Sequence, residues 1–230
     1  MEEKKTRKWL LDVVSIVLAV ILIRAYVIQA YKIPTGSMED TLLVGDFLFA
    51  TKFNYGLQVP FRNKMLFKWN RPKRGEIVIF RFPLERKDFV KRCIAVARDT
   101  VEIRSKVLYI NGEKVEEPYV IHTDKHHIYP PLKLNDRERY QSLWQNGEFR
   151  NAGGYVRDNF GSVVIPEDYV FLMGDNRDNS YDSRFWGPLS YDNLRGRPFI
   201  IHWSWKKEIP MYKLLKKIRW DRIGVIVTNL

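Results

Sequence analysis

The stretch Ile33-Pro34-Thr35-Gly36-Ser37-Met38 divides the chain into two parts of different character. Before it lies an N-terminal segment that is almost continuously apolar from Val13 to Ile23. After it, short runs of apolar and aromatic residues alternate with turn-forming residues, a pattern typical of β-strands joined by turns. The stretch itself places a serine after a glycine, and a glycine lets another segment of backbone come close.

The N-terminal segment has the length of a membrane span. Between Asp12 and Arg24 all residues but one are apolar, and residues 9–30 supply the roughly 20 positions that cross a bilayer core. We therefore expect a transmembrane anchor over residues 9–30, with the basic residues 1–8 in the cytoplasm and the remainder outside. The alternatives are a buried soluble helix and a cleaved signal peptide, for which Ile28-Gln29-Ala30 is a poor cleavage site.

The composition is that of a folded protein with a basic surface. The 230 residues are 45% hydrophobic and 29% charged, with a net charge of +12, which suits one domain of ordinary size plus an appendage. Such charge fits nucleic acid or an anionic membrane. Because no nucleic-acid-binding motif accompanies it, we expect membrane lipid and no nucleic acid. The single cysteine, Cys93, excludes an internal disulfide, and the spacing of His122, His126 and His127 matches no familiar metal site. We expect no metal and no cofactor.

Evenly spaced short strands predict the fold class. The apolar runs lie at residues 47–50, 77–82, 107–110, 163–165, 170–173 and 199–201. Asn111-Gly112 predicts a tight hairpin, because both residues tolerate positive φ. We expect a mostly β fold with antiparallel sheets. Residues 116–160 are polar and contain several prolines and glycines, so we expect them to form a small inserted cap subdomain. The β core would then consist of residues 31–115 and 161–230.

A basic amphipathic segment lies near the C-terminus and follows Pro210, which suits a first helical position. The apolar residues at helical spacing are Met211, Leu214, Leu215 and Ile218. The basic residues of the other face are Lys213, Lys216, Lys217 and Arg219, so the segment is predicted to be an amphipathic helix. Two interpretations stay open. The helix could pack on the β core, or it could contact anionic lipid beside three tryptophans, Trp203, Trp205 and Trp220.

Lys91 is the base that the sequence offers to Ser37. A serine hydroxyl is a weak nucleophile and needs a base, and the histidines occur in no recognisable triad context. In a strand over residues 89–96, Lys91 shares a face with Phe89 and Cys93, and burial there would lower its pKa. Lowering it from about 10.4 to 7–8 costs roughly 3–5 kcal/mol, which a β core tolerates. The alternative is an ordinary lysine at a strand edge.

A polar loop over residues 174–184 is the third distinctive segment. It packs aspartate, arginine, asparagine and serine into eleven positions, and such a loop is held by side-chain to backbone hydrogen bonds and ion pairs. A calcium loop is excluded, because no glycine follows at the turn and Arg177 would stand at a ligand position.

Together these segments resemble type I signal peptidase, the family of membrane-bound serine proteases that removes signal peptides from exported proteins. The likeness runs through nearly the whole chain. It includes the anchor and the segments 33–42, 74–78, 91–92 and 174–187. Family members have a β core with a variable cap, which fits residues 116–160. Many Gram-negative members carry two spans before the catalytic serine, whereas this chain has room for one.

The resemblance implies a role for each candidate residue. Ser37 would be the nucleophile and Lys91 its general base, and the Ser37 backbone N–H and the Thr35 hydroxyl would form the oxyanion hole. The residues implied to support this pair are Ser180, which would orient the lysine amine, and the ion pair of Asp182 and Arg184. Asp88, at the start of the strand, has no implied role.

The resemblance also implies the substrate and the location. Preproteins would bind as an added strand, with small residues at the first and third positions before the cut. The candidate pocket walls are Met38, Leu42 and Phe89. The implied location is the bacterial cytoplasmic (inner) membrane, with the catalytic domain on the outer face near the export machinery.

Two other functions remain open from the sequence. Self-cleaving repressors of the SOS type use a serine–lysine pair on a related β fold, but they lack a membrane span. A membrane-anchored basic binding protein would share the anchor and the charge without catalysis.

Overall fold

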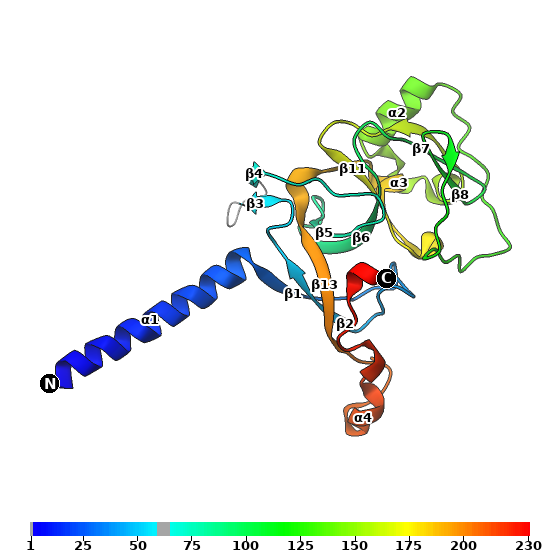
Figure 1. Cartoon of the computed structure of the whole chain (residues 1–230). Coiled ribbons are helices and arrows are strands. Elements are labelled where there is room, and N and C mark those ends of the chain that lie inside the picture. The colour runs from blue at the N-terminus through cyan, green and yellow to red at the C-terminus, as the bar shows by residue number, and fades with distance from the viewer. Residues whose placement is uncertain (1, 59–64) are drawn as a thin grey trace.

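A computed structural model describes residues 2–58 and 65–230 and shows a long N-terminal helix leading into a mostly β body (Figure 1). The helices are α1 (Glu2–Tyr26), α2 (Arg137–Gln145), α3 (Ser183–Trp186) and α4 (Leu214–Lys217). The first strands are β1 (Ile28–Lys32), β2 (Asp46–Thr51), β3 (Gly56–Gln58), β4 (Met65–Lys68), β5 (Ile77–Arg81), β6 (Asp88–Ala95) and β7 (Thr100–Arg104). The others are β8 (Val107–Ile110), β9 (Glu113–Lys114), β10 (Phe160–Val164), β11 (Tyr169–Met173), β12 (Leu189–Ser190) and β13 (Leu194–Ser204).

These strands form three sheets of antiparallel pairs, which confirms the mostly β prediction. The largest has the order β1-β2-β13-β5-β6-β11-β12, and two smaller sheets have the orders β10-β7-β8-β9 and β3-β4. The predicted hairpin at Asn111-Gly112 is also confirmed. Ile110 pairs with Glu113 across it, and the two turn residues have φ of 54° and 86°.

The segment 116–160, which was predicted to form a cap, shares its core with the large sheet. Trp144 of α2 and Phe149 pack in one apolar cluster with Phe160 of β10 and Phe171 of β11. The four-stranded sheet beneath them is built from strands on both sides of the segment. These contacts fix the segment against β11, one of the strands next to the candidate site.

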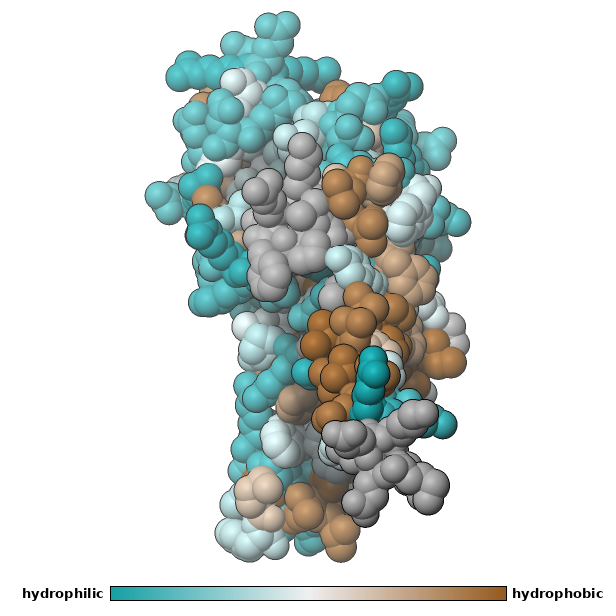
Figure 2. All heavy atoms as spheres, turned by 90° about the vertical axis from the view of Figure 1, so that its left-hand side faces the viewer, coloured by the Kyte–Doolittle hydropathy of each residue, from teal (hydrophilic) through white to brown (hydrophobic). Residues whose placement is uncertain are grey.

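Helix α1 projects away from the β body (Figure 1). Its large apolar side chains from Leu10 to Ile23 are exposed, and Figure 2 shows hydrophobic atoms gathered on this side of the molecule. Of the helices in the described residues, none has both the length and the apolar content of a segment that crosses a bilayer.

The C-terminal segment differs from the helix predicted for it. A short 3-10 helix, Met211–Lys213, leads into α4, which ends at Lys217. Ile218 is extended and pairs with Trp205 at the end of β13. Among the residues at helical spacing, only Ile218 is buried, while Met211 and Leu215 are exposed. The interpretation that this face packs on the β core is therefore wrong, because the extended Ile218 ends the helix before its last apolar position.

Candidate active site

Strand β6 carries Lys91 into the interior of the large sheet. β6 lies between β5 and β11, and Lys91 is paired with Val78 of β5. The lysine side chain extends under the segment that bears Ser37 and is only 2% exposed. A central strand with neighbours on both sides leaves such a side chain little access to water.

Ser37 lies in a turn between β1 and β2, held by the loop 174–184. The Asn176 backbone N–H donates to the Ser37 carbonyl oxygen at 3.2 Å. At Gly174 a Cβ atom would lie 2.3 Å from that carbonyl oxygen and 2.4 Å from Ser180 Oγ. Only glycine permits this approach of two backbones, so Gly174 fixes the position of the serine.

The structure brings Ser37 and Lys91 together. Lys91 Nζ lies 2.5 Å from Ser37 Oγ in a hydrogen bond. Burial lowers the pKa of Lys91 to about 8, while the carboxylates of Asp182 and Asp175 oppose this shift and the Arg184 guanidinium adds to it. The neighbouring charges come from residues 174–184 and not from the same strand. A lysine in this environment is partly neutral near pH 8 and can accept a proton.

Ser180 and the buried ion pair lie directly behind this dyad. Ser180 Oγ accepts a hydrogen bond from the Gly174 N–H at 3.1 Å and donates to Asp182. Asp182 pairs with Arg184 at 2.8 Å, and both side chains are almost fully buried. Arg184 also donates to two backbone carbonyl oxygens, at 2.7 Å each, from Arg157 and Arg177. The contacts of Ser180 thus join Gly174 to the ion pair, and its expected bond to Lys91 stays a prediction.

Two cavities of about 440 Å³ each open at Ser37. One contains Thr35, Ser37, Lys91 and Phe89 in its wall, and the other contains Met38 and Phe89. Both Ser37 and the candidate oxyanion donor Thr35 therefore border open space. Leu42 is fully buried in the apolar cluster that contains Met38. Leu42 lines neither of these two cavities. It could form a pocket wall, as expected from the sequence, only if the residues that cover it moved.

A second buried charge network supports the nucleophile segment, and the sequence interpretation did not include it. Asp175 accepts two hydrogen bonds from Arg92, at 2.9 and 2.7 Å, and one from the Thr41 hydroxyl at 2.6 Å. Arg222 donates to the Thr41 carbonyl oxygen at 2.9 Å. Thr41 is thus held from both sides, four residues beyond Ser37. One feature of the sequence could have predicted this network: Arg92 follows the candidate base directly and lies on the opposite face of its strand.

The histidines of the cap do not gather. His126 and His127 are exposed, and His122 Nδ1 lies 3.3 Å from an oxygen of Asp178. Within residues 2–58 and 65–230, no group of three or more His, Cys, Asp or Glu side chains is placed to hold a metal ion.

Comparison with known proteins identifies relatives along most of the chain. Residues 6–203 match the family described as signal peptidase, peptidase S26. Signal peptidase I of Aquifex aeolicus is 35% identical, over 87% of this chain and 85% of that protein. Those of Pseudomonas fluorescens and Helicobacter pylori are each 32% identical. They cover 90% and 94% of this chain, and 74% and 91% of their own lengths.

A crystal structure of a signal peptidase I from Enterococcus faecalis V583 aligns with 56% of this chain and 97% of its own. At 26% identity and a TM-score of 0.37, that likeness adds nothing to the assignment. The match over residues 6–203 and the identity to full-length relatives are sufficient without it. The chain belongs to the signal peptidase family, peptidase S26.

Proposed function

We propose that this chain is a type I signal peptidase that cleaves signal peptides from preproteins with a Ser37–Lys91 dyad. The observation that carries this proposal is the 2.5 Å contact between Ser37 Oγ and a buried Lys91 whose pKa is lowered to about 8. The pair needs no histidine and no metal ion to generate a nucleophile.

In the proposed reaction the neutral Lys91 amine accepts the Ser37 proton as Oγ attacks the carbonyl carbon of the scissile peptide bond. The resulting oxyanion is stabilised by the Ser37 backbone N–H and the Thr35 hydroxyl. When the intermediate collapses, the Lys91 ammonium gives its proton to the departing amine, and an ester to Ser37 remains. A water molecule, deprotonated by Lys91, then hydrolyses this ester and restores both residues.

The substrate is proposed to be an extended segment that adds beside the exposed backbone near Ser37. The two cavities that meet at this serine would receive alternate side chains of such a segment, and Met38 and Phe89 would form parts of their walls. The large apolar side chain of Phe89 borders both cavities. Small residues before the cut would fit beside it.

We also propose that α1 anchors the chain in the bacterial cytoplasmic membrane. The support is the row of exposed apolar side chains from Leu10 to Ile23 on a helix that projects from the body (Figure 1). In this arrangement residues 1–8 are cytoplasmic. The span expected over residues 9–30 would end with α1 at Tyr26, because Ile28–Lys32 form β1 and pair with β2. The core, residues 31–115 and 161–230, and the cap, residues 116–160, lie outside, where preproteins leave the export machinery.

The test is cleavage of a preprotein by the purified chain in detergent. The wild-type chain should release a signal peptide at one site, located by mass spectrometry, whereas Ser37→Ala should leave the preprotein intact. Ser142→Ala is the matched control, because Ser142 is an exposed serine on α2, and it should cleave at the wild-type rate. Cleavage by Ser37→Ala at the wild-type rate would exclude Ser37 as the nucleophile.

A further inference from the structure

The two cavities that meet at Ser37 differ in their access to the proposed base. Lys91 and Ser180 lie in the wall of one cavity, and Lys91 is absent from the described residues that line the other. In the proposed reaction Lys91 Nζ gives its proton to the departing amine, which requires that amine within hydrogen-bond distance. The residue that leaves with the amine therefore belongs to the cavity that contains Lys91, here called the amine-side cavity. The other is called the acyl-side cavity.

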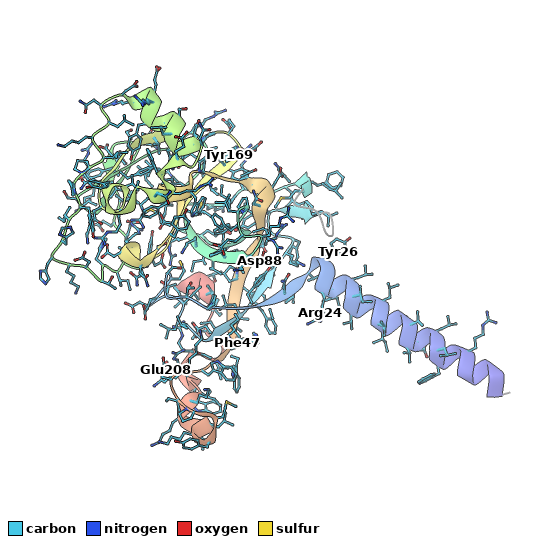
Figure 3. The ribbon with its side chains drawn as sticks, turned by 180° about the vertical axis from the view of Figure 1, so that it is seen from behind. Arg24, Tyr26, Phe47, Asp88, Tyr169 and Glu208 are labelled. Carbon is cyan, nitrogen blue, oxygen red and sulfur yellow. The ribbon has the colours of Figure 1, made fainter. Side chains whose placement is uncertain are left out.

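The acyl-side cavity lies on the side of the body at which α1 ends. Its wall includes Tyr31 and Lys32 of β1, the strand that follows α1, and Asp88 at the start of β6. Figure 3 shows Asp88 on the side of the body where Tyr26 ends α1. A bound substrate would thus have its residues before the cut toward α1. Its residues after the cut would lie along the loop 174–184, which supplies much of the amine-side wall.

An ordered aromatic ring borders the amine-side cavity. Tyr181 is 46% exposed, and its ring stacks on that of Phe185 with the ring centres 5.5 Å apart. The Phe82 ring meets Tyr181 edge-on, with a centre-to-centre distance of 6.4 Å. A ring already held by two others loses little further freedom when a ligand packs against it. The exposed part of Tyr181 is therefore suited to contact with an apolar or aromatic side chain.

The charged groups in the same wall already have partners. Asp178 is the one acidic residue among the described residues of this wall, and its side chain is 2% exposed. One carboxylate oxygen accepts the Asp124 N–H at 2.8 Å, and Lys106 Nζ lies 3.2 Å from the other. Lys91 is buried and bonded to Ser37. A charged substrate side chain would find neither group free, so the cavity favours an uncharged one.

We propose that the amine-side cavity is a specificity site in which Tyr181 binds an apolar or aromatic side chain from one of the first two residues after the cut. This inference rests on the proposed function, because it uses Lys91 as the proton donor to the leaving amine. Side chains of an extended segment alternate between two faces, so one of these two residues faces the cavity. Contact between two aromatic rings should raise the specificity constant about two- to twelvefold.

The experiment compares preprotein peptides that differ only after the cut. Each has alanine at the first and third positions before the cut, and phenylalanine or alanine at the first or the second position after it. The wild-type chain should cleave the phenylalanine peptide of one series about two- to twelvefold better, as a ratio of specificity constants. Tyr181→Ala should bring this ratio close to one, whereas Tyr181→Phe should retain it because the ring is kept.

Two controls separate this contact from a general disturbance of the site. A ratio measured with one enzyme preparation does not depend on how much of that preparation is active. Tyr155→Ala removes another exposed tyrosine, which lines neither cavity, and should give the wild-type ratio. The preference for alanine over glycine directly before the cut should be the same in the wild type and in Tyr181→Ala, because that side chain enters the acyl-side cavity.

Three results would overturn the proposal. The first is equal cleavage of the phenylalanine and alanine peptides by the wild type at both positions. The second is an unchanged ratio in Tyr181→Ala. The third is an equal change in the preference before the cut, which would show that Tyr181 acts on the whole site. A wild-type chain that cleaves none of the peptides would refute the proposed function, and this inference with it.

Discussion

The titration of Lys91 provides the most direct test of the proposed dyad. Its pKa is lowered to about 8 by burial, and only the neutral amine can take the Ser37 proton. About 1% of the lysine would then be neutral at pH 6, half at pH 8 and about nine-tenths at pH 9. The specificity constant should therefore rise roughly tenfold per pH unit below pH 7.5 and become constant above pH 9.

The assay follows cleavage of a fluorogenic preprotein peptide from pH 5.5 to 10.5 at constant ionic strength, with circular dichroism to confirm that the chain stays folded. Lys91→Arg is the control and should be inactive throughout, because a guanidinium keeps its proton at these pH values. An unperturbed lysine would give a rate that still rises at pH 10. A flat profile from pH 6 to 9, or an active Lys91→Arg variant, would refute Lys91 as the base.

Four further sets of variants test the surrounding groups in the same assay. Ser37→Ala and Lys91→Met should each remove several orders of magnitude of activity, and the double variant should lose little more, because the two residues act as one unit; additive losses would contradict the dyad. Thr35→Val should lower turnover by about 10²–10³, the usual contribution of one oxyanion donor, while Thr35→Ser should retain most activity; a normal rate for the valine variant would place the donor elsewhere. Gly174→Ala should lower activity by at least about 100-fold, since its Cβ would lie 2.3 Å from the Ser37 carbonyl oxygen; an unchanged rate would show that this approach is not needed. Arg184→Gln should move the pH profile to higher pH, because the unpaired Asp182 carboxylate would favour the charged lysine, and Arg184→Lys should move it less; equal midpoints for all three would disprove the coupling.

The sequence is sufficient to predict the strands. It also identifies Ser37 as the candidate nucleophile and Lys91 as its candidate base. Strand positions follow from local alternation and turn residues, as at Asn111-Gly112, whose conformation depends on neighbouring residues only. The pairing of Lys91 with Ser37 can be predicted in part from the local sequence. A lysine among apolar strand residues must find a partner or lose its charge. The family resemblance supplied the rest of that pairing.

Long-range contacts were the part that local patterns could not supply. Asp175 joins Arg92 and Thr41, which are 83 and 134 residues away in the sequence, and no periodicity encodes such a meeting. The C-terminal segment shows a second limit. Helical spacing placed its apolar residues on one face, but it could not tell whether protein or another apolar phase covers that face. The structure leaves the face of Met211 and Leu215 uncovered within the described residues.

The two buried ion pairs explain how a lysine near two carboxylates can still become neutral. Asp182 and Asp175 both raise the pKa of Lys91, and in a medium of low dielectric constant an unpaired carboxylate would keep the lysine charged. Each carboxylate is already paired, Asp182 with Arg184 at 2.8 Å and Asp175 with Arg92 at 2.7 Å. Since arginine stays protonated over the working pH range, both pairs remain intact while Lys91 titrates. The net field at the amine is then small, and desolvation determines its pKa. Buried ion pairs generally add little to stability, so their value here lies in setting the charge state of Lys91.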